Sequence, residues 1–292
     1  MCAQPRLVRL PNAAALSSLV TAVLGLNPGK MTLQGSNIYL VGAGKRRILV
    51  DSGQGVPEFL PLLRTVLTSN DASISDILIT HRHHDHIGGI AQALQTTTDH
   101  APIRVWKRIT PRDTAPTTAR EFAYHSIEDN QLFVTEGATL RALHTPGHCD
   151  DHVVFFLEEE NALFSGDCVL GQGSTTFEDL KEYMDSLQRT LDTFPFINRI
   201  YPGHGPDLSN GREVVRQYIQ HRLDRENEII KVLGEAENQQ TARQIVEIIY
   251  ALYPQTLWAS AEYSVRQHLK KLQQEGRVKE VFLHDKFLYA LL

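Results

Sequence analysis

The sequence has few cysteines and no long apolar run. Its three cysteines, Cys2, Cys149 and Cys168, are too few for a disulfide framework in a chain of 292 residues, which indicates a reducing compartment. No segment approaches the roughly 18 uninterrupted apolar residues of a membrane-spanning helix, so we expect no membrane span. The formal net charge of −5 argues against a protein that coats nucleic acid through bulk positive charge, although local basic patches stay possible.

Acidic residues are absent before Asp51, while six basic residues precede it. An acid-poor, arginine-containing start is typical of a mitochondrial transit peptide. The apolar segments 7–10 and 20–26 instead favour the first strands of a sheet. The two interpretations are compatible if an uncleaved start is recognised. The mitochondrial matrix is therefore the expected location, with the cytoplasm as the alternative.

The order of the predicted elements favours a layered α/β body. Apolar residues at helical spacing predict helices over 57–67, 87–94 and 177–191. A β-hairpin is expected over 37–51. Further strands are predicted at 76–80, 103–106, 131–134, 139–143, 152–157, 162–165 and 199–201. Strands first alternate with helices, then cluster, then alternate again, which suits two sheets covered by helices.

The pattern changes after residue 208, where a second domain is predicted. Helix patterns cover 213–233, 241–250 and 264–275, and two strands follow at 278–283 and 286–292. Thr241 is expected to cap the second helix and Gly276 to end the third. Three helices and a two-stranded wing are typical of a winged-helix-like domain. We therefore predict a catalytic domain over 1–208 and a winged-helix-like domain over 209–292.

Ligand-type side chains are concentrated directly after the apolar run 77–79. His81, His83, Asp85 and His86 lie within six residues, and imidazole and carboxylate are the groups that zinc favours. Three more such residues, His148, Asp167 and His204, each follow a predicted strand and a glycine, which lets the backbone turn sharply at a sheet edge. Five histidines and two carboxylates in this arrangement match two metal ions, with room for a water.

This set of residues resembles the metallo-β-lactamase superfamily, whose H-x-H-x-D-H motif corresponds to residues 81–86. The resemblance implies an αββα sandwich with the C-terminal winged-helix-like domain appended. It also implies a ligand set for two zinc ions. By this resemblance, the first zinc is held by His81, His83 and His148, the second by Asp85, His86 and His204, and Asp167 bridges both.

Such a pair of zinc ions would hold a bridging hydroxide for attack on the substrate. Asp85 and Asp167 are accordingly expected to be catalytic as well as metal-binding. His152 follows the His148 ligand, and two interpretations of it stay open. It either protonates a leaving oxygen or is a structural histidine that opens a strand. The ligands alone do not choose between a phosphodiester, a thioester and an amide.

Spacing and flanking sequence narrow the branch of the superfamily. His148 and Asp167 are 19 positions apart, and Asp167 and His204 are 37 apart, too short for the insertion of the β-CASP nucleases. This chain has an aspartate at position 167, where the true zinc β-lactamases have a cysteine. The C-terminal pattern does not resemble the helical domain of glyoxalase II. Segments 27–35, 145–152 and 164–171 resemble the animal β-lactamase-like protein 2 group. Fungal thioesterases that release polyketides share much of the pattern.

Members of the animal group are zinc-dependent endoribonucleases that act on single-stranded RNA. The resemblance therefore implies single-stranded RNA as the partner, with thioester hydrolysis on acyl carriers as the alternative. A third possibility is a nucleic-acid-binding protein with structural zinc. The oligomeric state stays open.

The expected RNA contacts are local, because residues 209–292 contain 12 basic and 11 acidic residues and so are not basic as a whole. Hydroxyls and amides of the loop 171–176 suit a phosphate, although a plain loop is an equal interpretation. Lys107, Arg108 and the basic residues of 266–279 are further candidates for a patch, or belong to a solvated face. The residues predicted to bind substrate are Arg82, Ser174, Thr175 and Lys270.

Overall fold

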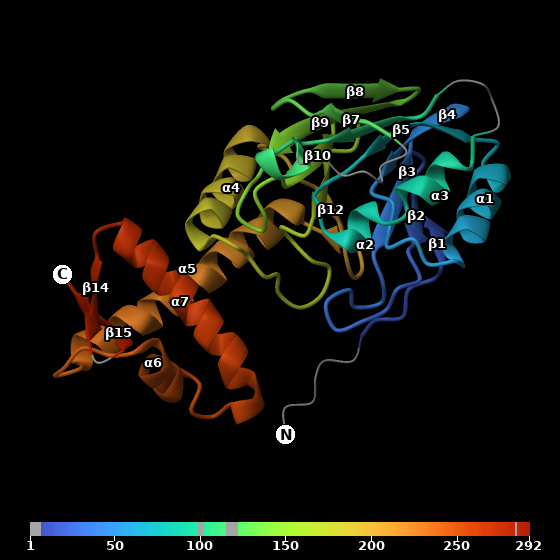
Figure 1. The fold of residues 1–292 in the computed structure, drawn as a ribbon. Coiled ribbons are helices and arrows are strands. Elements are labelled where there is room, and N and C mark those ends of the chain that lie inside the picture. Colours follow the sequence, from blue (N-terminus) through green and yellow to red (C-terminus); the bar gives the residue numbers. More distant parts are fainter. Residues whose placement is uncertain (1–6, 98–101, 115–121, 284) are drawn as a thin grey trace.

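Two β-sheets packed face to face, with helices on both outer faces, form the larger part of the molecule (Figure 1). The structure is a computed structural model that describes residues 7–97, 102–114, 122–283 and 285–292. The αββα sandwich predicted from the sequence is confirmed, and a smaller C-terminal domain of helices and a β-hairpin follows it. No helix among the described residues is long and apolar enough to cross a membrane.

The first sheet holds seven strands in sequential order. They are β1 (Ala13–Ala15), β2 (Val20–Leu24), β3 (Asn37–Val41), β4 (Arg46–Val50), β5 (Ser73–Leu78), β6 (Arg104–Lys107) and β7 (Tyr124–Ser126). β3 and β4 form the predicted hairpin, while β4 to β7 run parallel. The helices α1 (Phe59–Ser69) and α3 (Ile90–Leu94) cover the outer face of this sheet. The one-turn helix α2 (His84–Ile87) precedes α3.

The second sheet holds six strands in the order β13-β12-β11-β10-β9-β8. They are β8 (Leu132–Thr135), β9 (Ala138–His144), β10 (Val153–Leu157), β11 (Ala162–Gly166), β12 (Arg199–Pro202) and β13 (Leu208–Ser209). Its outer face packs on α4 (Leu180–Thr193). Asp179 is the N-cap of this helix, and its carboxylate accepts a hydrogen bond from the backbone N–H of Glu182. The apolar core between the two sheets includes Tyr39, Phe155 and Phe164.

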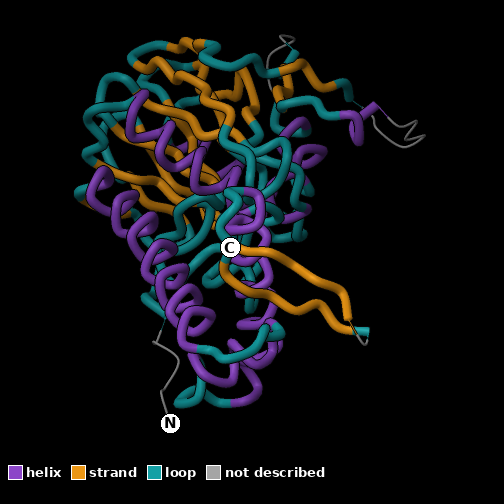
Figure 2. Tube along the Cα trace, turned by 90° about the vertical axis from the view of Figure 1, so that its left-hand side faces the viewer, coloured by secondary structure: helices purple, strands orange, loops and turns teal. Residues whose placement is uncertain are grey.

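The C-terminal domain contains three helices and a hairpin. These are α5 (Gly211–Glu235), α6 (Ala242–Ile249), α7 (Trp258–Gln274), β14 (Val278–Leu283) and β15 (Lys286–Leu291), and the hairpin projects from the helices (Figure 2). Thr241 caps α6 through a reciprocal capping box with Gln244, as predicted. The first half of α5 packs on the second sheet through Val215, whereas its later residue Ile229 belongs to the C-terminal core. α5 thus joins the two domains.

Two details differ from the sequence prediction. Residues 7–10 form no strand, since the backbone of Val8 exchanges hydrogen bonds with the side chains of Gln34 and Gln172 instead of a neighbouring strand. The predicted helix 87–94 is broken into α2 and α3. The break lies at Gly88-Gly89, where an added Cβ at Gly89 would lie 2.0 Å from the carbonyl oxygen of Ser52, so the chain packs backbone against backbone there.

The C-terminal core contains a histidine, His268, whose ring is fully buried and whose two nitrogens find no hydrogen-bond partner among the residues that the structure describes. Burial, followed by the positive charges of Arg222 and Lys271, lowers the pKa of His268 to about 3. The unfolded chain takes up a proton near pH 6.5, whereas the folded chain does so only near pH 3. The unfolded state therefore binds more protons between these values, and stability falls with pH below about 6.5.

We expect the wild-type chain to lose about 2 kcal/mol of unfolding free energy through His268 between pH 7 and pH 5. Chemical denaturation at both pH values, followed by circular dichroism, measures the loss. The variant His268→Leu should show a loss that is smaller by that amount. Equal pH dependence of the two proteins would contradict the assignment to His268.

Candidate metal centre

Four strand ends meet at one edge of the sandwich and place the ligand-type side chains there. β5 leads to His81 and α2, while β9, β11 and β12 lead to His148, Asp167 and His204. β11 and β12 are parallel, and β9 runs in the same direction because β10 is antiparallel to both β9 and β11. The structure therefore brings together all seven residues predicted to bind metal, in two groups.

The first group consists of His81, His83, His148 and Asp167. Nδ1 of His83 lies 3.0 Å from Nε2 of His81 and 3.1 Å from Nε2 of His148. Oδ2 of Asp167 lies 4.0 Å and 3.7 Å from the same two Nε2 atoms. Three ring nitrogens and one carboxylate oxygen thus converge on a single point.

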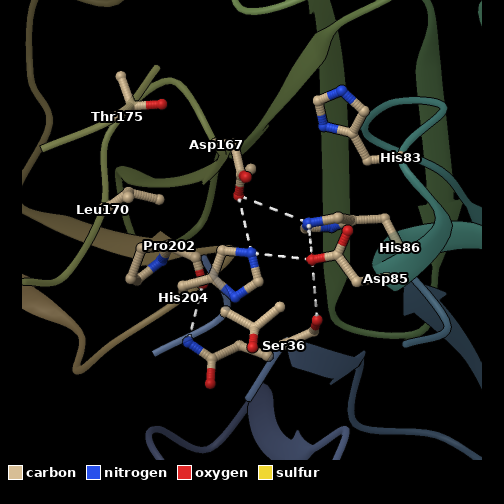
Figure 3. A network of polar contacts seen from close by, with 12 residues as sticks. Ser36, His83, Asp85, His86, Asp167, Leu170, Thr175, Pro202 and His204 are labelled. Carbon is tan, nitrogen blue, oxygen red and sulfur yellow. Dashed lines mark hydrogen bonds and ion pairs between the residues drawn. The ribbon is translucent and has the colours of Figure 1, made fainter. Parts of the chain in front are cut away.

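The second group consists of Asp85, His86 and His204, and Asp167 joins it to the first (Figure 3). Oδ2 of Asp85 lies 3.4 Å from Nε2 of His86 and 3.1 Å from Nε2 of His204. Oδ1 of Asp167 lies 3.5 Å from each of these Nε2 atoms. The two oxygens of one carboxylate therefore face different groups, which is the arrangement of a bridging ligand.

The buried polar atoms of this centre fit two divalent cations. Nε2 of His86 and Oδ1 of Asp167 are both buried without a hydrogen-bond partner among the described residues, a costly arrangement that a bound cation would satisfy. Burial, and then the neighbouring His86, lower the pKa of His81 well below its usual value, so its ring is neutral and has a lone pair to offer. A set of imidazoles and carboxylates is the set that zinc favours.

The second group in its metal-free form holds protons that a metal would displace. Burial alone would lower the pKa of His204, but the adjacent Asp167 and Asp85 raise it to about 9. The burial of Asp167 is in turn outweighed by the charges of His204 and His86, which hold the pKa of this carboxyl well below its usual range. Asp167 is therefore ionised, and binding of a cation would release protons from the histidines.

A hydrogen bond to the second ring nitrogen fixes the orientation of each of four histidines in the centre. Nδ1 of His86 lies 2.7 Å from Oδ2 of Asp51, and Nδ1 of His81 lies 2.9 Å from Oγ1 of Thr80. Thr80 in turn donates to Asp51 through its hydroxyl, at 2.8 Å. The other two contacts are from His148 to the carbonyl oxygen of Thr176 and from His204 to that of Gly35. Such contacts fix which nitrogen faces a metal.

Asp51 is a functional residue that the sequence interpretation missed. It is 2% exposed and lies directly after β4, before Ser52 and Gly53. This carboxylate follows a strand, as the later ligands do, but it precedes the nearby glycine, whereas those ligands come directly after one. Its contacts make Asp51 a positioning residue for His86.

The contacts of His152 do not fit the prediction that this histidine protonates the leaving oxygen. Its ring is fully buried, and Nε2 accepts a hydrogen bond from the backbone N–H of Asp167 at 3.1 Å. Nδ1 lies 3.0 Å from the hydroxyl of Thr145 and 3.4 Å from Sγ of Cys168. Both nitrogens are thus engaged within the protein. The geometry supports the structural alternative, in which His152 positions Asp167.

The charges of Arg82 and Lys270, both predicted to bind substrate, are compensated by acidic neighbours. Arg82 donates to Glu178 at 2.6 Å and pairs with Asp150 at 3.3 Å. Nζ of Lys270 lies 2.7 Å from Asp179, the capping residue of α4. Neither side chain therefore offers an unpaired positive charge.

The side chain of Lys107 does not form part of an RNA-binding surface patch. It is 1% exposed, and its Nζ lies 2.8 Å from both Asp113 and Asp151. The prediction that Lys107 contributes to such a patch is wrong, because a side chain at the end of β6 points into the protein, where it compensates Asp151.

Ser174 and Thr175 lie on the loop beside the first metal-ligand group. Oγ1 of the buried Thr175 lies 3.4 Å from Nδ1 of His148. Ser174 is exposed, and its hydroxyl accepts a hydrogen bond of 2.6 Å from Nη2 of Arg222 on α5. Ser174 thus faces solvent next to the metal centre, whereas Thr175 faces His148.

The sequence matches models of two known domains. A model of the metallo-beta-lactamase superfamily matches residues 31–208, and a model of the beta-lactamase associated winged helix domain matches residues 241–284. Both domains of the structure are therefore accounted for, and the winged helix expected from the sequence is confirmed.

Similar proteins agree with these matches. The chain is 43% identical over 285 residues to the Beta-lactamase-like protein 2 homolog of Drosophila melanogaster, covering 96% of this chain and 97% of the fly protein. It is 40% identical over 233 residues to the atrochrysone carboxyl ACP thioesterase nsrC of Aspergillus novofumigatus, covering 80% and 68%. A beta-lactamase domain protein from Burkholderia ambifaria has the same fold, with a TM-score of 0.78, 19% identity, and coverage of 96% and 93%.

Proposed function

The chain belongs to the metallo-beta-lactamase superfamily, and on that premise we propose that it is a zinc-dependent endoribonuclease that hydrolyses phosphodiester bonds of single-stranded RNA. The observation on which the hydrolytic part depends is the position of Asp167, whose two oxygens face two separate groups of ligand atoms. Two zinc ions held there would supply a hydroxide at neutral pH and neutralise charge on the attacked phosphate.

Residues behind the centre fix the orientation of the histidines that would hold the metal ions. Asp51 and Thr80 orient His86 and His81 from behind, and the backbone of Thr176 orients His148. The Nδ1 atoms of these three histidines are hydrogen-bonded within the protein. A substrate must therefore approach the side on which their Nε2 atoms converge. No side chain of the chain is required to attack the phosphorus atom.

Two lines of support favour RNA. Similarity covers 96% of the chain for the Beta-lactamase-like protein 2 homolog of Drosophila melanogaster, and the resemblance of the sequence to the animal group of that name implies cleavage of single-stranded RNA. In addition, a cleft of about 560 Å³ beside the centre is lined by the hydroxyl of Ser174 and the guanidinium of Arg222, groups that suit a phosphate. The second candidate is a thioesterase on acyl carriers, which the name of the fungal relative favours.

Removal of metal tests the hydrolytic centre. We expect dialysis of the purified chain against a chelator to lower cleavage of a labelled single-stranded RNA by at least about 100-fold, and added zinc to restore it. The products should have 5′-phosphate and 3′-hydroxyl ends, as attack by a hydroxide requires. Cleavage that is insensitive to the chelator, or a cyclic phosphate product, would rule out the proposed chemistry.

The same preparation discriminates between the two substrates. An acyl thioester is offered to the chain under the same conditions as the RNA. Turnover of the thioester without cleavage of RNA would select the second candidate.

A further inference from the structure

The two domains enclose a cleft next to the metal centre. Its volume is about 560 Å³, and its walls come from three parts of the chain: the loop around Met31, the loop 174–177, and the helices α5 and α7. The loop 174–177 lies directly behind His148, since the carbonyl oxygen of Thr176 lies 2.8 Å from Nδ1 of that histidine. A ligand in the cleft would therefore lie beside a substrate at the metals.

One wall of the cleft contains an arginine whose charge is not balanced by an acidic partner. Arg222 of α5 is 7% exposed, and its Nε is buried with no hydrogen-bond partner in the part of the chain that the structure describes. Nη2 donates to the hydroxyl of Ser174 at 2.6 Å and to the carbonyl oxygen of Thr175 at 3.2 Å. Over the residues that the structure describes, no carboxylate forms an ion pair with Arg222. A buried guanidinium without a counter-ion favours an anion at the neighbouring surface.

Ser174 lies between this charge and solvent. Because its oxygen accepts from Arg222, its own hydroxyl hydrogen is free to donate outward. The guanidinium polarises this hydroxyl and makes it a stronger donor. An exposed hydroxyl supported by a buried cation is well suited to a phosphate oxygen.

Helix α7 contributes an aromatic surface to the lining of the cleft. The ring of Tyr263 on α7 is half exposed, and its hydroxyl donates to the carbonyl oxygen of Phe177 at 3.1 Å, which fixes the ring against the loop. The exposed side chain of Met31 also lines the cleft. A flat aromatic ring and a thioether are surfaces on which a nucleobase stacks regardless of its identity.

We propose that this cleft binds one nucleotide of single-stranded RNA adjacent to the scissile phosphate, with its phosphate at Ser174 and Arg222 and its base against Tyr263. The proposal rests on the proposed endoribonuclease function. It gives the C-terminal domain a place in substrate binding, because Arg222 and Tyr263 lie on α5 and α7. The wing hairpin takes no part in it.

Kinetics of the metal-loaded full chain on a single-stranded RNA oligonucleotide test the proposal. We expect Tyr263→Ala to raise KM about tenfold, the loss of one stacked base, and to leave kcat within about twofold. Tyr263→Phe keeps the ring and should keep a KM near that of the wild type. Ser174→Ala should raise KM about fivefold through the lost phosphate contact. Phe196→Ala, which removes an exposed aromatic ring on the loop after α4, is the matched control and should change neither constant.

Binding without turnover provides a second measurement. In chains that also contain Asp167→Ala, fluorescence anisotropy of a labelled RNA should show the same tenfold weakening by Tyr263→Ala. A wild-type chain that cleaves RNA, combined with an unchanged KM and Kd in Tyr263→Ala, would overturn the cleft and leave the nuclease intact. A wild-type chain that cleaves thioesters but not RNA, with thioester turnover impaired by Tyr263→Ala, would overturn the RNA occupant together with the proposed function.

Discussion

For the proposed two-zinc endoribonuclease, Asp167→Ala is expected to lower kcat/KM for single-stranded RNA by about 10³-fold and to reduce the bound zinc from two ions per chain to about one. The reason is the geometry of its carboxylate. Oδ2 lies 4.0 Å or less from two nitrogens of the first group, and Oδ1 lies 3.5 Å from two nitrogens of the second. Removal of Asp167 takes one ligand from each group and leaves His86 and His204 to repel one another when charged.

Metal analysis by mass spectrometry, next to the cleavage assay, separates the two parts of this expectation. Asp192→Ala is the matched control, because Asp192 is an exposed carboxylate on α4 that accepts a hydrogen bond from the side chain of Gln188, away from the ligand groups. It should retain full activity and metal content. A chain with Asp167→Ala that still held two zinc ions would show that Asp167 does not bridge them.

Most of the sandwich could be predicted from the sequence because its strands are buried on at least one face. All five residues of β10 are buried, and so are those of β3, which gives continuous apolar runs that are easily recognised. The strands that were missed, β1, β7 and β13, have only two or three residues each. β1 consists of three alanines and β13 of two residues, so neither has the length or the apolar pattern of a strand. Their pairing depends on neighbours brought close by the rest of the fold.

More of the metal centre than of the cleft could be predicted from the sequence, because its residues follow a local sequence pattern. Each ligand has a local signal, namely a ligand-type side chain after a strand and near a glycine, and Asp51 has that signal too. Arg222 has none, since it lies within the 25-residue helix α5, whose exposed positions also contain arginines. The role of Arg222 is apparent only in the structure, where α5 packs against the loop at Ser174. Likewise, only the structure shows that the charge of Lys270 on α7 is paired with Asp179.

The largest effect on stability is expected from Lys107→Met, which should lower the unfolding free energy by about 3–5 kcal/mol. Nζ of Lys107 lies 2.8 Å from Oδ2 of Asp151, and the side chains are 1% and 0% exposed. Without the lysine, Asp151 keeps a buried charge whose other contact is the weak donor Cys149, at 3.2 Å. Asp151 lies on the loop that holds His148, so metal content should fall as well.

Thermal unfolding of the metal-loaded chain measures this loss, which corresponds to a fall in Tm of roughly 10 °C. The double variant Lys107→Met/Asp151→Asn should recover most of it, because a pair without charge has nothing left to compensate. Lys45→Met is the matched control: Lys45 pairs with Asp71 at 3.6 Å, but these side chains are 83% and 87% exposed, so water screens them and the cost should stay below about 1 kcal/mol. Equal losses in the two single variants would mean that the charge of Asp151 is not the source of the effect.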